Sequence, residues 1–529
     1  MRIVTIFVNI DALVASQILD GFVKSSRARR ANPQGVIDAF YRYITGYCRK
    51  GANSKMIISH IKQHQRRILL IEPPFYRLYE AGYALVKFPL SLAYLSLAVK
   101  THTEWDVKVF NADFAPVSAR FDITWMTGNG YDRYMENLES PSFEIWSAVW
   151  SVLQSYRPTV VGISVKSSTL AAAFRIAGIA KSIDSSAVIV VGGPHPSSTG
   201  AEMLENRDID ICVSGEGETT LVELLHAIES GGSLDDVAGL SFRNGRQHQF
   251  TALRTLSASL DDLGFPFQYA RDILIDYEKY PKRAFGYLFA TRGCPHRCLY
   301  CGSREIWGRK PRFRDTEHVA TEITSLQSMG VTRFHFDDDT FGVTGDYLRR
   351  LCHALKYLTP GITWSCEIHV RLVNDANIRL MKDAGCRMIQ LGIESGNNDI
   401  LKHIRKGFTI EAALAACRLI VRHGIRLHTF FMAGFPWETE ATLHDTRMAM
   451  ETTDCEKIIY SLFTPYPGTE AFRLCRAEGL IPERYNPSLF GHQSPRNCFC
   501  LHLTPERFRT ISHDLETLAA QKNRARRQV

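Results

Sequence analysis

The chain has 529 residues, of which 45% are hydrophobic and 22% charged, as is ordinary for a soluble globular protein of about three domains. No apolar run approaches the ~18 residues that a membrane span needs, so a membrane-spanning protein is excluded. The net charge of +8 does not predict a nucleic-acid surface, because two short clusters match it: Lys24, Arg27, Arg29, Arg30, Lys522, Arg524, Arg526 and Arg527.

Thirteen cysteines are scattered through long stretches that alternate between strand and helix patterns. A disulfide scaffold would instead be short and rich in loops. No signal peptide with a small-residue cleavage site is evident near the N-terminus. We therefore expect reduced thiols and a cytoplasmic protein.

Residues 1–64 form an N-terminal extension with helical stretches and no interpretable role. Residues 65–230 then alternate short apolar strands with amphipathic helices. The expected strands are 68–71, 107–110, 160–164, 188–191 and 209–213, with a helix at 89–99. This alternation predicts an α/β fold with a doubly wound, Rossmann-like parallel sheet.

The loops after these strands are where an open α/β sheet binds its ligand. Gly192 and Gly193 follow one strand directly, and glycine allows the backbone to approach a large flat or phosphorylated ligand closely. A tight strand-to-helix turn explains the same glycine pair equally well.

Residues 231–283 are expected to be a linker with a small hairpin at 243–246. Residues 284–480 form a second α/β region, and 481–529 a helical C-terminal extension. The expected strands of the second region are 287–290, 333–336, 363–366, 388–391, 427–431 and 457–460. Six strand–helix repeats are fewer than the eight of a closed barrel, so we expect a partial TIM-type (β/α)6 barrel.

Cys294, Cys298 and Cys301 follow the first strand of this barrel, at the end where barrel enzymes gather their function. Three thiolates on one tight loop can hold three irons of a four-iron cluster and leave the fourth iron open to a ligand. A zinc site is the alternative, and it would need a fourth ligand such as His296.

With its companion motifs, the cysteine motif resembles the radical S-adenosylmethionine (SAM) superfamily, in the class with an N-terminal cobalamin (B12)-binding domain. The companions in the barrel are Tyr300 and residues 336–341, 392–396, 434–439 and 466–469. Those in the first domain are residues 89–94, 192–195 and 215–218.

The resemblance implies a 4Fe–4S cluster on the three cysteines and reductive cleavage of SAM to a 5′-deoxyadenosyl radical. It places three acids at the methionine amino group, Glu394 and Ser395 at the ribose, and Met432 and Gly434 along the adenine. The residues expected at SAM are Tyr300, Asp337, Asp338, Asp339, Glu394, Ser395, Met432 and Gly434. Those expected at cobalamin are Ser164, Thr169, Gly192, Gly193, His195, Gly215 and Glu216.

Plainer interpretations stay open for several of these residues. The three acids could form a solvated loop, and Glu394 could make a salt bridge at a strand end. His195 is expected to be a turn residue beside the cofactor, not a cobalt ligand. Cys498 and Cys500 are expected to be structural, because two cysteines are too few for a second cluster.

The chain departs from the family in one respect. Many cobalamin domains carry Asp-x-His-x-x-Gly, whose histidine binds the cobalt, whereas residues 72–74 here are Glu-Pro-Pro. Many members of this radical class also lack that histidine, so its absence does not exclude cobalamin.

The leading hypothesis is methylation of an unactivated carbon of a natural-product or lipid intermediate, with an electron donor such as flavodoxin or ferredoxin. Cyclisation, oxidation or rearrangement without methyl transfer is the alternative, since fold and motifs do not separate these outcomes. A cobalamin or redox sensor is less favoured, because a sensor needs no SAM pocket. A tRNA methylthiotransferase is disfavoured because residues 67–230 hold one cysteine, Cys212.

Overall fold

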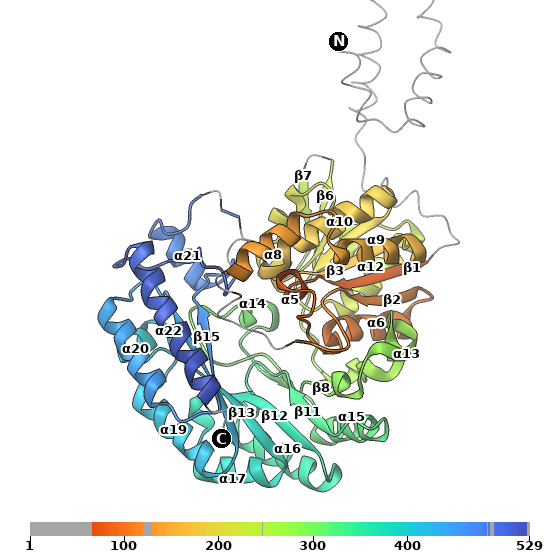
Figure 1. Cartoon of the computed structure of the whole chain (residues 1–529). Coiled ribbons are helices and arrows are strands. Elements are labelled where there is room, and N and C mark those ends of the chain that lie inside the picture. The colour runs from red at the N-terminus through yellow and green to blue at the C-terminus, as the bar shows by residue number, and fades with distance from the viewer. Residues whose placement is uncertain are drawn as a thin grey trace, which may run out of the picture.

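The computed structural model describes residues 66–119, 126, 129–245, 247–483, 485–486 and 491–525. The extension expected at 1–64 lies outside the described residues. So do six members of the two cation clusters: Lys24, Arg27, Arg29, Arg30, Arg526 and Arg527. Two separate large sheets organise what is described, one in each half of the chain (Figure 1).

The first sheet has seven strands in the order β2-β1-β3-β4-β5-β6-β7. They are β1 (Arg67–Glu72), β2 (Asp106–Asn111), β3 (Val160–Ser164), β4 (Val188–Gly192), β5 (Ile211–Val213), β6 (Leu240–Asn244) and β7 (Gln247–Phe250). The first five are parallel, and β6 and β7 add an antiparallel edge. The hairpin expected at 243–246 is this β6–β7 pair. Strand order reverses between β1 and β3, which makes their carboxyl ends a topological switch point.

Helices cover both faces of the first sheet, as expected for strands that are apolar on both sides. Alternate residues of β1 point to opposite faces: Leu70 packs with α6 and α12, and Leu69 with α9 and α10. The helices are α5 (Tyr76–Tyr79), α6 (Leu90–His102), α8 (Asn129–Glu139), α9 (Glu144–Tyr156), α10 (Leu170–Ile183), α11 (Pro194–Thr199), α12 (Glu218–Ser230) and α13 (Ala270–Ile273). The predicted doubly wound fold is confirmed.

The second sheet has six parallel strands in the order β15-β14-β13-β12-β11-β8. They are β8 (Tyr287–Leu288), β11 (Arg333–Phe336), β12 (Thr363–Ile368), β13 (Cys386–Glu394), β14 (Arg426–Ala433) and β15 (Lys457–Leu462). Its two edge strands, β8 and β15, do not pair with each other, so the predicted partial barrel is confirmed. Strand β8 is shorter than expected because Ala290 donates its N–H to the Asp338 side chain.

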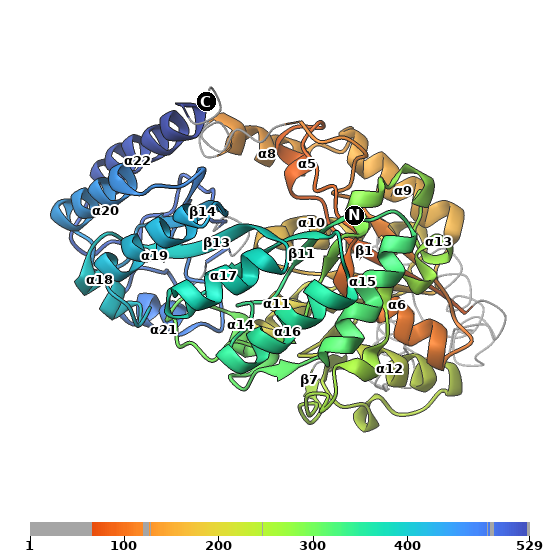
Figure 2. The same ribbon diagram turned by 90° about the horizontal axis from the view of Figure 1, so that it is seen from below.

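Helices line the outer side of this partial barrel (Figures 1 and 2). They are α15 (Thr316–Ser328), α16 (Gly345–Leu358), α17 (Asp375–Asp383), α18 (Asn398–His403), α19 (Ile410–Arg422), α20 (Glu440–Thr452), α21 (Glu470–Ala477) and α22 (Pro505–Ala525). A short hairpin of β9 (Thr291–Arg292) and β10 (Arg312–Phe313) encloses α14 (Ser303–Trp307). Within the described ranges, no helix combines the length and apolar character of a membrane span.

Candidate functional site

The cysteine loop leaves β9 and enters α14 at the carboxyl ends of the barrel strands. Gly293 turns the chain with φ of +97°, a conformation that favours glycine. The loop is anchored to the barrel by a hydrogen bond from the Leu299 N–H to the Ile404 carbonyl (3.1 Å). The sequence therefore presents all three cysteines from one short, fixed loop.

Cys294, Cys298 and Cys301 line one cavity of about 320 Å³ inside the partial barrel. The other side chains around it come from the cysteine loop, from the carboxyl ends of several strands and from the turn after α18. They include His296, Tyr300, Asp339, Glu367, His369, Gln390, Glu394, Lys406, Met432 and Ser461. One cavity thus joins the cysteine loop to residues that are far apart in sequence.

The environment of the thiols favours a polynuclear centre. Burial raises the pKa of Cys294 to about 12 and that of Cys301 to about 11, so bound cations would be needed to hold the thiolates. Three thiols from one loop are the ligand set of an iron–sulfur cluster with one open iron, whereas a structural zinc site would need a fourth protein ligand.

The three consecutive acids after β11 lie in three different environments. Asp337 forms an ion pair with Lys87 of the first domain. Asp338 is 3% exposed and accepts hydrogen bonds from Ala290 and Thr291, at the base of the cysteine loop. Asp339 lines the cluster cavity, and burial raises the pKa of its carboxyl. Of the three acids, Asp339 is the one in the described lining of the cavity that holds the thiols.

Replacing Asp338 with alanine is expected to destabilise the protein by about 2–4 kcal/mol. The buried N–H groups of Ala290 and Thr291 and the Thr291 hydroxyl would lose their acceptor, at ~1–3 kcal/mol for each unsatisfied buried group. Urea unfolding measures the change. Asp346→Asn on the exposed face of α16 serves as the control, and an equal loss in both variants would contradict this role.

Glu394 ends β13 with φ of +73°, an unusual conformation for a residue with a side chain. Its Oε1 atom accepts hydrogen bonds from the Tyr300 hydroxyl (3.0 Å) and from Lys406 Nζ (3.1 Å). Its side chain is therefore both a strand-end salt bridge and part of the cavity wall. Ser395 is fully buried and lies 3.3 Å from the hydroxyl of Thr446 on α20, so its side chain is engaged away from the cavity lining.

The loop after β14 carries the last two residues expected at SAM. Met432 lines the cluster cavity, and Gly434 has φ of +105°. The N–H groups of Gly434 and Phe435 both donate to Glu438 Oε2, at 2.5 and 3.0 Å. Glu438 had no predicted role, yet its buried carboxyl group accepts both of these N–H groups and sets the shape of this loop.

Glu438 makes the stability depend on pH in a defined direction. Burial raises its pKa to about 8 from an ordinary value of 4.5, so the unfolded chain loses this proton first as pH rises. Stability due to this group is complete below about pH 4.5 and declines through about pH 8. Glu438→Gln is expected to flatten that decline. Melting temperatures at about pH 5 and about pH 8 measure the difference, and parallel declines in both proteins would contradict it.

Cys498 and Cys500 lie outside the described lining of the cluster cavity. Their thiols are hydrogen-bonded to each other, and this bond lowers the pKa of Cys498 to about 7. Cys500 is buried near Glu438. Their structural role stays a prediction.

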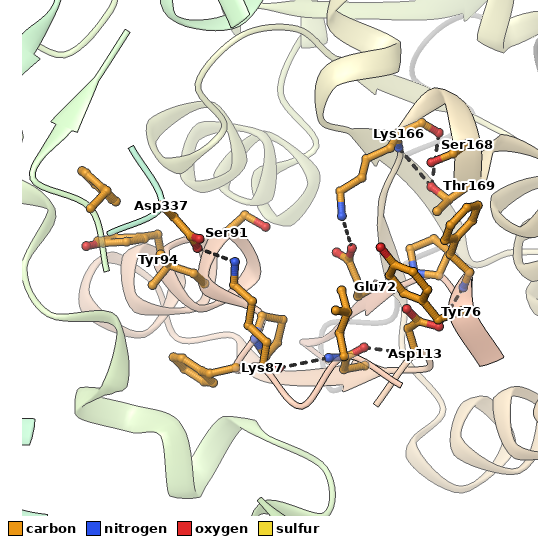
Figure 3. A pocket seen from close by; sticks show the side chains of 18 of the residues that line it. Glu72, Tyr76, Lys87, Ser91, Tyr94, Asp113, Lys166, Ser168, Thr169 and Asp337 are labelled. Carbon is orange, nitrogen blue, oxygen red and sulfur yellow. Dashed lines mark hydrogen bonds and ion pairs between the residues drawn. The ribbon is translucent and has the colours of Figure 1, made fainter. Parts of the chain in front are cut away.

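A second cavity of about 420 Å³ lies between the two sheets (Figure 3). The first domain lines it from the carboxyl ends of β1 and β3 and the start of α6, and the second from the loops after β8 and β11. Figure 3 shows two ion pairs on opposite sides of it, Lys166 with Glu72 (2.7 Å) and Lys87 with Asp337. Asp339 lines both cavities, so the two are adjacent.

The residues expected at cobalamin divide between this cavity and its surroundings. Thr169 lines it, whereas the four expected residues on β3, β4 and α11 are not in its described lining. Ser164 ends β3, Gly192 ends β4, Gly193 caps α11, and His195 lies within α11. At Gly193 an added Cβ would lie 3.0 Å from the Val165 carbonyl oxygen, so glycine is required there by the backbone. Burial lowers the pKa of His195 to about 4.

Glu216 lies in a buried ion-pair network between the domains, and the structure places it away from the cavity lining. Its carboxylate accepts hydrogen bonds from Arg292 (2.8 Å) and from both terminal nitrogens of Arg312 (2.8 and 2.9 Å). Glu218 accepts from Arg292 at 2.6 Å. Gly215, with φ of +77°, turns the chain into this network. The motif at 215–218 therefore joins the domains.

Three cations of the site were missed by sequence analysis: Lys87, Arg292 and Lys406. Each pairs with an acid far away in sequence or on another element, as in Lys87 with Asp337. Only Arg292 had a local indication, since it directly precedes Gly293 and the first cysteine.

Two family models match the chain. The Radical SAM superfamily matches residues 288–449, and the B12 binding domain matches residues 88–225. The first match covers β11 to β14 of the second sheet, and the second match covers β2 to β5 of the first sheet.

Similar curated proteins include a methyltransferase and a cyclase. The uncharacterized methyltransferase PH0819 of Pyrococcus horikoshii is 29% identical over 418 residues, 78% of this chain and 84% of that protein. The anaerobic magnesium-protoporphyrin IX monomethyl ester cyclase of Synechocystis sp. is 30% identical over 302 residues, 56% of this chain and 59% of that protein.

Among solved structures, the radical S-adenosylmethionine methyltransferase TsrM from Kitasatospora setae, with cobalamin and a 4Fe–4S cluster bound, is similar in fold. The TM-score is 0.60 at 18% identity, over 78% of this chain and 75% of that chain.

Proposed function

We propose that this chain, which belongs to the radical SAM superfamily and to its class with a B12-binding domain, methylates an unactivated carbon of a small molecule. One observation carries the proposal: the cavity that holds the three thiols adjoins the cavity between the domains, with Asp339 in the wall of both. A reaction that uses a cluster-bound ligand and a corrin together needs such adjacency.

The residues present fit both groups. Cys294, Cys298 and Cys301 would hold the cluster. Asp339, Glu394 and Met432 would contact SAM bound beside the cluster. Cobalamin would lie at the switch point between β1 and β3, beside Thr169. When bound, the cluster supplies the electron that cleaves SAM, and cobalamin supplies the methyl group.

The chain's own residues position the reactants and limit solvent access. Tyr94, Phe289 and Trp307 line the cavity between the domains, and all three rings lie within 4.7–5.5 Å of the Arg292 guanidinium. Arg292, which these rings surround, also lines this cavity and belongs to the interdomain network of Glu216. A dry, shaped chamber prevents a reactive radical from being quenched by competing reactions.

We assign the parts of the chain accordingly. Residues 65–230 would bind cobalamin, and residues 284–480 would bind the cluster and SAM. Residues 231–283 would link them, with β6 and β7 extending the first sheet, and 481–529 would be a helical extension. A natural-product or lipid intermediate is the proposed substrate, a flavodoxin or ferredoxin the electron donor, and the cytoplasm the location.

Cyclisation without methyl transfer is the second candidate, favoured by the 30% identity to the Synechocystis cyclase. That similarity spans 59% of the cyclase, whereas the similarity to PH0819 spans 84% of the methyltransferase. The more complete match favours methylation.

Methyl transfer from SAM can be tested before the acceptor is known. The protein would be reconstituted anaerobically with iron, sulfide and hydroxocobalamin, then reduced with titanium citrate in the presence of SAM deuterated in its methyl group. We expect S-adenosylhomocysteine, 5′-deoxyadenosine and deuterium in the cobalamin extracted from the protein. 5′-Deoxyadenosine without S-adenosylhomocysteine or label would favour the cyclase alternative.

A further inference from the structure

We propose that Lys406 is a fixed positive charge that sets the reduction potential of the centre held by Cys294, Cys298 and Cys301. This inference rests on the proposed function, because it presupposes a cluster on those thiols. Lys406 would act only through its charge, by stabilising the reduced form of the centre. It would take part in no bond that forms or breaks.

The side chain of Lys406 is 7% exposed and lines the same cavity as the thiols. Burying an ammonium group is costly unless an acid pairs with it. Glu394 provides that acid at 3.1 Å, and the Tyr300 hydroxyl lies 3.4 Å from the same nitrogen. Burial alone would lower the pKa of Lys406, but the ion pair with Glu394 raises it, so the group stays charged.

The backbone around Lys406 is held in place. Arg405 and Gly407 on either side have φ of +59° and +73°. The Lys406 carbonyl lies 3.1 Å from His369 Nε2, and the preceding Ile404 carbonyl accepts from Leu299 of the cysteine loop. The ammonium group is therefore fixed relative to the thiols, not carried on a mobile surface chain.

Charge is unevenly distributed around the cavity. Lys406 is the one lysine or arginine among the described residues that line it, against the three thiols and the acids Asp339, Glu367 and Glu394. His296 and His369, the other basic side chains in the lining, stack with ring centres 3.6 Å apart. Because Lys406 and the three thiols line the same cavity, its charge acts directly on a centre held there.

A positive charge in a buried site favours the form of a cluster that has gained an electron. The alternative is a structural role, in which Lys406 only neutralises Glu394. The two roles predict different results for the variant that lacks both charged side chains. Only the electrostatic role predicts that its reduction potential differs from that of Glu394→Gln.

The test is an electron paramagnetic resonance titration of the anaerobically reconstituted protein, without SAM or substrate. The deciding comparison is Glu394→Gln against Glu394→Gln/Lys406→Met, because these two proteins differ only in the cation. We expect the midpoint potential of the double variant to be more negative. The equilibrium constant for reduction of the centre should fall at least about tenfold, which corresponds to about 59 mV for one electron. Lys402→Met in the Glu394→Gln background is the control, since Lys402 lies on the exposed part of the same segment.

Equal potentials in the two deciding variants, with full iron content, would overturn the inference. If the double variant fails to hold iron, Glu394→Gln/Lys406→Gln replaces it, because glutamine removes the same charge and can still bond to the Tyr300 hydroxyl. A wild-type protein that holds no iron would refute the proposed function itself, so the two failures are distinguishable.

Discussion

Cys298→Ser is expected to give a folded protein that loses most of its iron and forms at least about a thousandfold less 5′-deoxyadenosine from SAM. A cluster loses one of its three protein ligands in this variant, and thiolate ligation is what holds such clusters. The effect on folding is expected to be small, because Cys298 is half-buried and serine keeps its shape. Iron analysis and product quantification by mass spectrometry measure the two losses.

Cys498→Ser is the matched control for this prediction. Cys498 is also half-buried, but it lies outside the described lining of the cluster cavity, hydrogen-bonded to Cys500. We expect this variant to keep its iron and its SAM cleavage. Equal iron in the Cys298 and Cys498 variants would show that the cysteine loop is not the cluster site.

Arg292→Met is expected to lower the free energy of unfolding by about 3–5 kcal/mol, the usual effect of breaking a buried charge pair. Arg292 is 7% exposed and bonds to Glu216 and Glu218 of the other domain. Its loss leaves the buried Glu218 carboxylate without this partner and leaves Glu216 with Arg312 alone. Urea unfolding measures the loss of stability. The pKa of Glu216 is held below its usual range chiefly by its hydrogen bonds to the arginines, which offset the effect of burial.

Glu223→Gln provides the control, because Glu223 lies on α12, the helix that also carries Glu218. Its partner is Arg254, and its side chain is 41% exposed, so this pair is expected to contribute less than about 1 kcal/mol. If Arg292→Met were no more destabilising than Glu223→Gln, the network would not be the link between the domains.

Sequence patterns predicted both sheets because their strands are buried runs of apolar residues. The run at 160–164 became β3 without a change in its bounds, and the parallel pairing follows from helices between strands. Strand β8 was predicted too long, because the Ala290 N–H bonds to a side chain instead of continuing the ladder. That exchange depends on where Asp338 lies, which no local pattern specifies.

The cysteine loop could be predicted because its three ligands are close in sequence. The roles of the neighbouring acids could not, since consecutive residues point in different directions after a strand ends. Asp338 turns inward to the loop base, while Asp337 reaches Lys87 in another domain. Glu216 was expected at cobalamin because it follows a strand end, but two distant arginines bind its carboxylate.

Lys406 illustrates what only a tertiary structure supplies. In sequence it is one of several cations in residues 402–406, and nothing distinguishes it from exposed Lys402. The fold buries one and exposes the other, because the turn at 404–407 is tied to the cysteine loop.

The most direct test of the account is the metal content of the protein after anaerobic reconstitution with iron, sulfide and hydroxocobalamin, followed by desalting. We predict about four irons and about one cobalt per chain, with the visible spectra of both groups. Iron without cobalt would contradict a cobalamin-dependent enzyme and leave the cavity between the domains to another ligand.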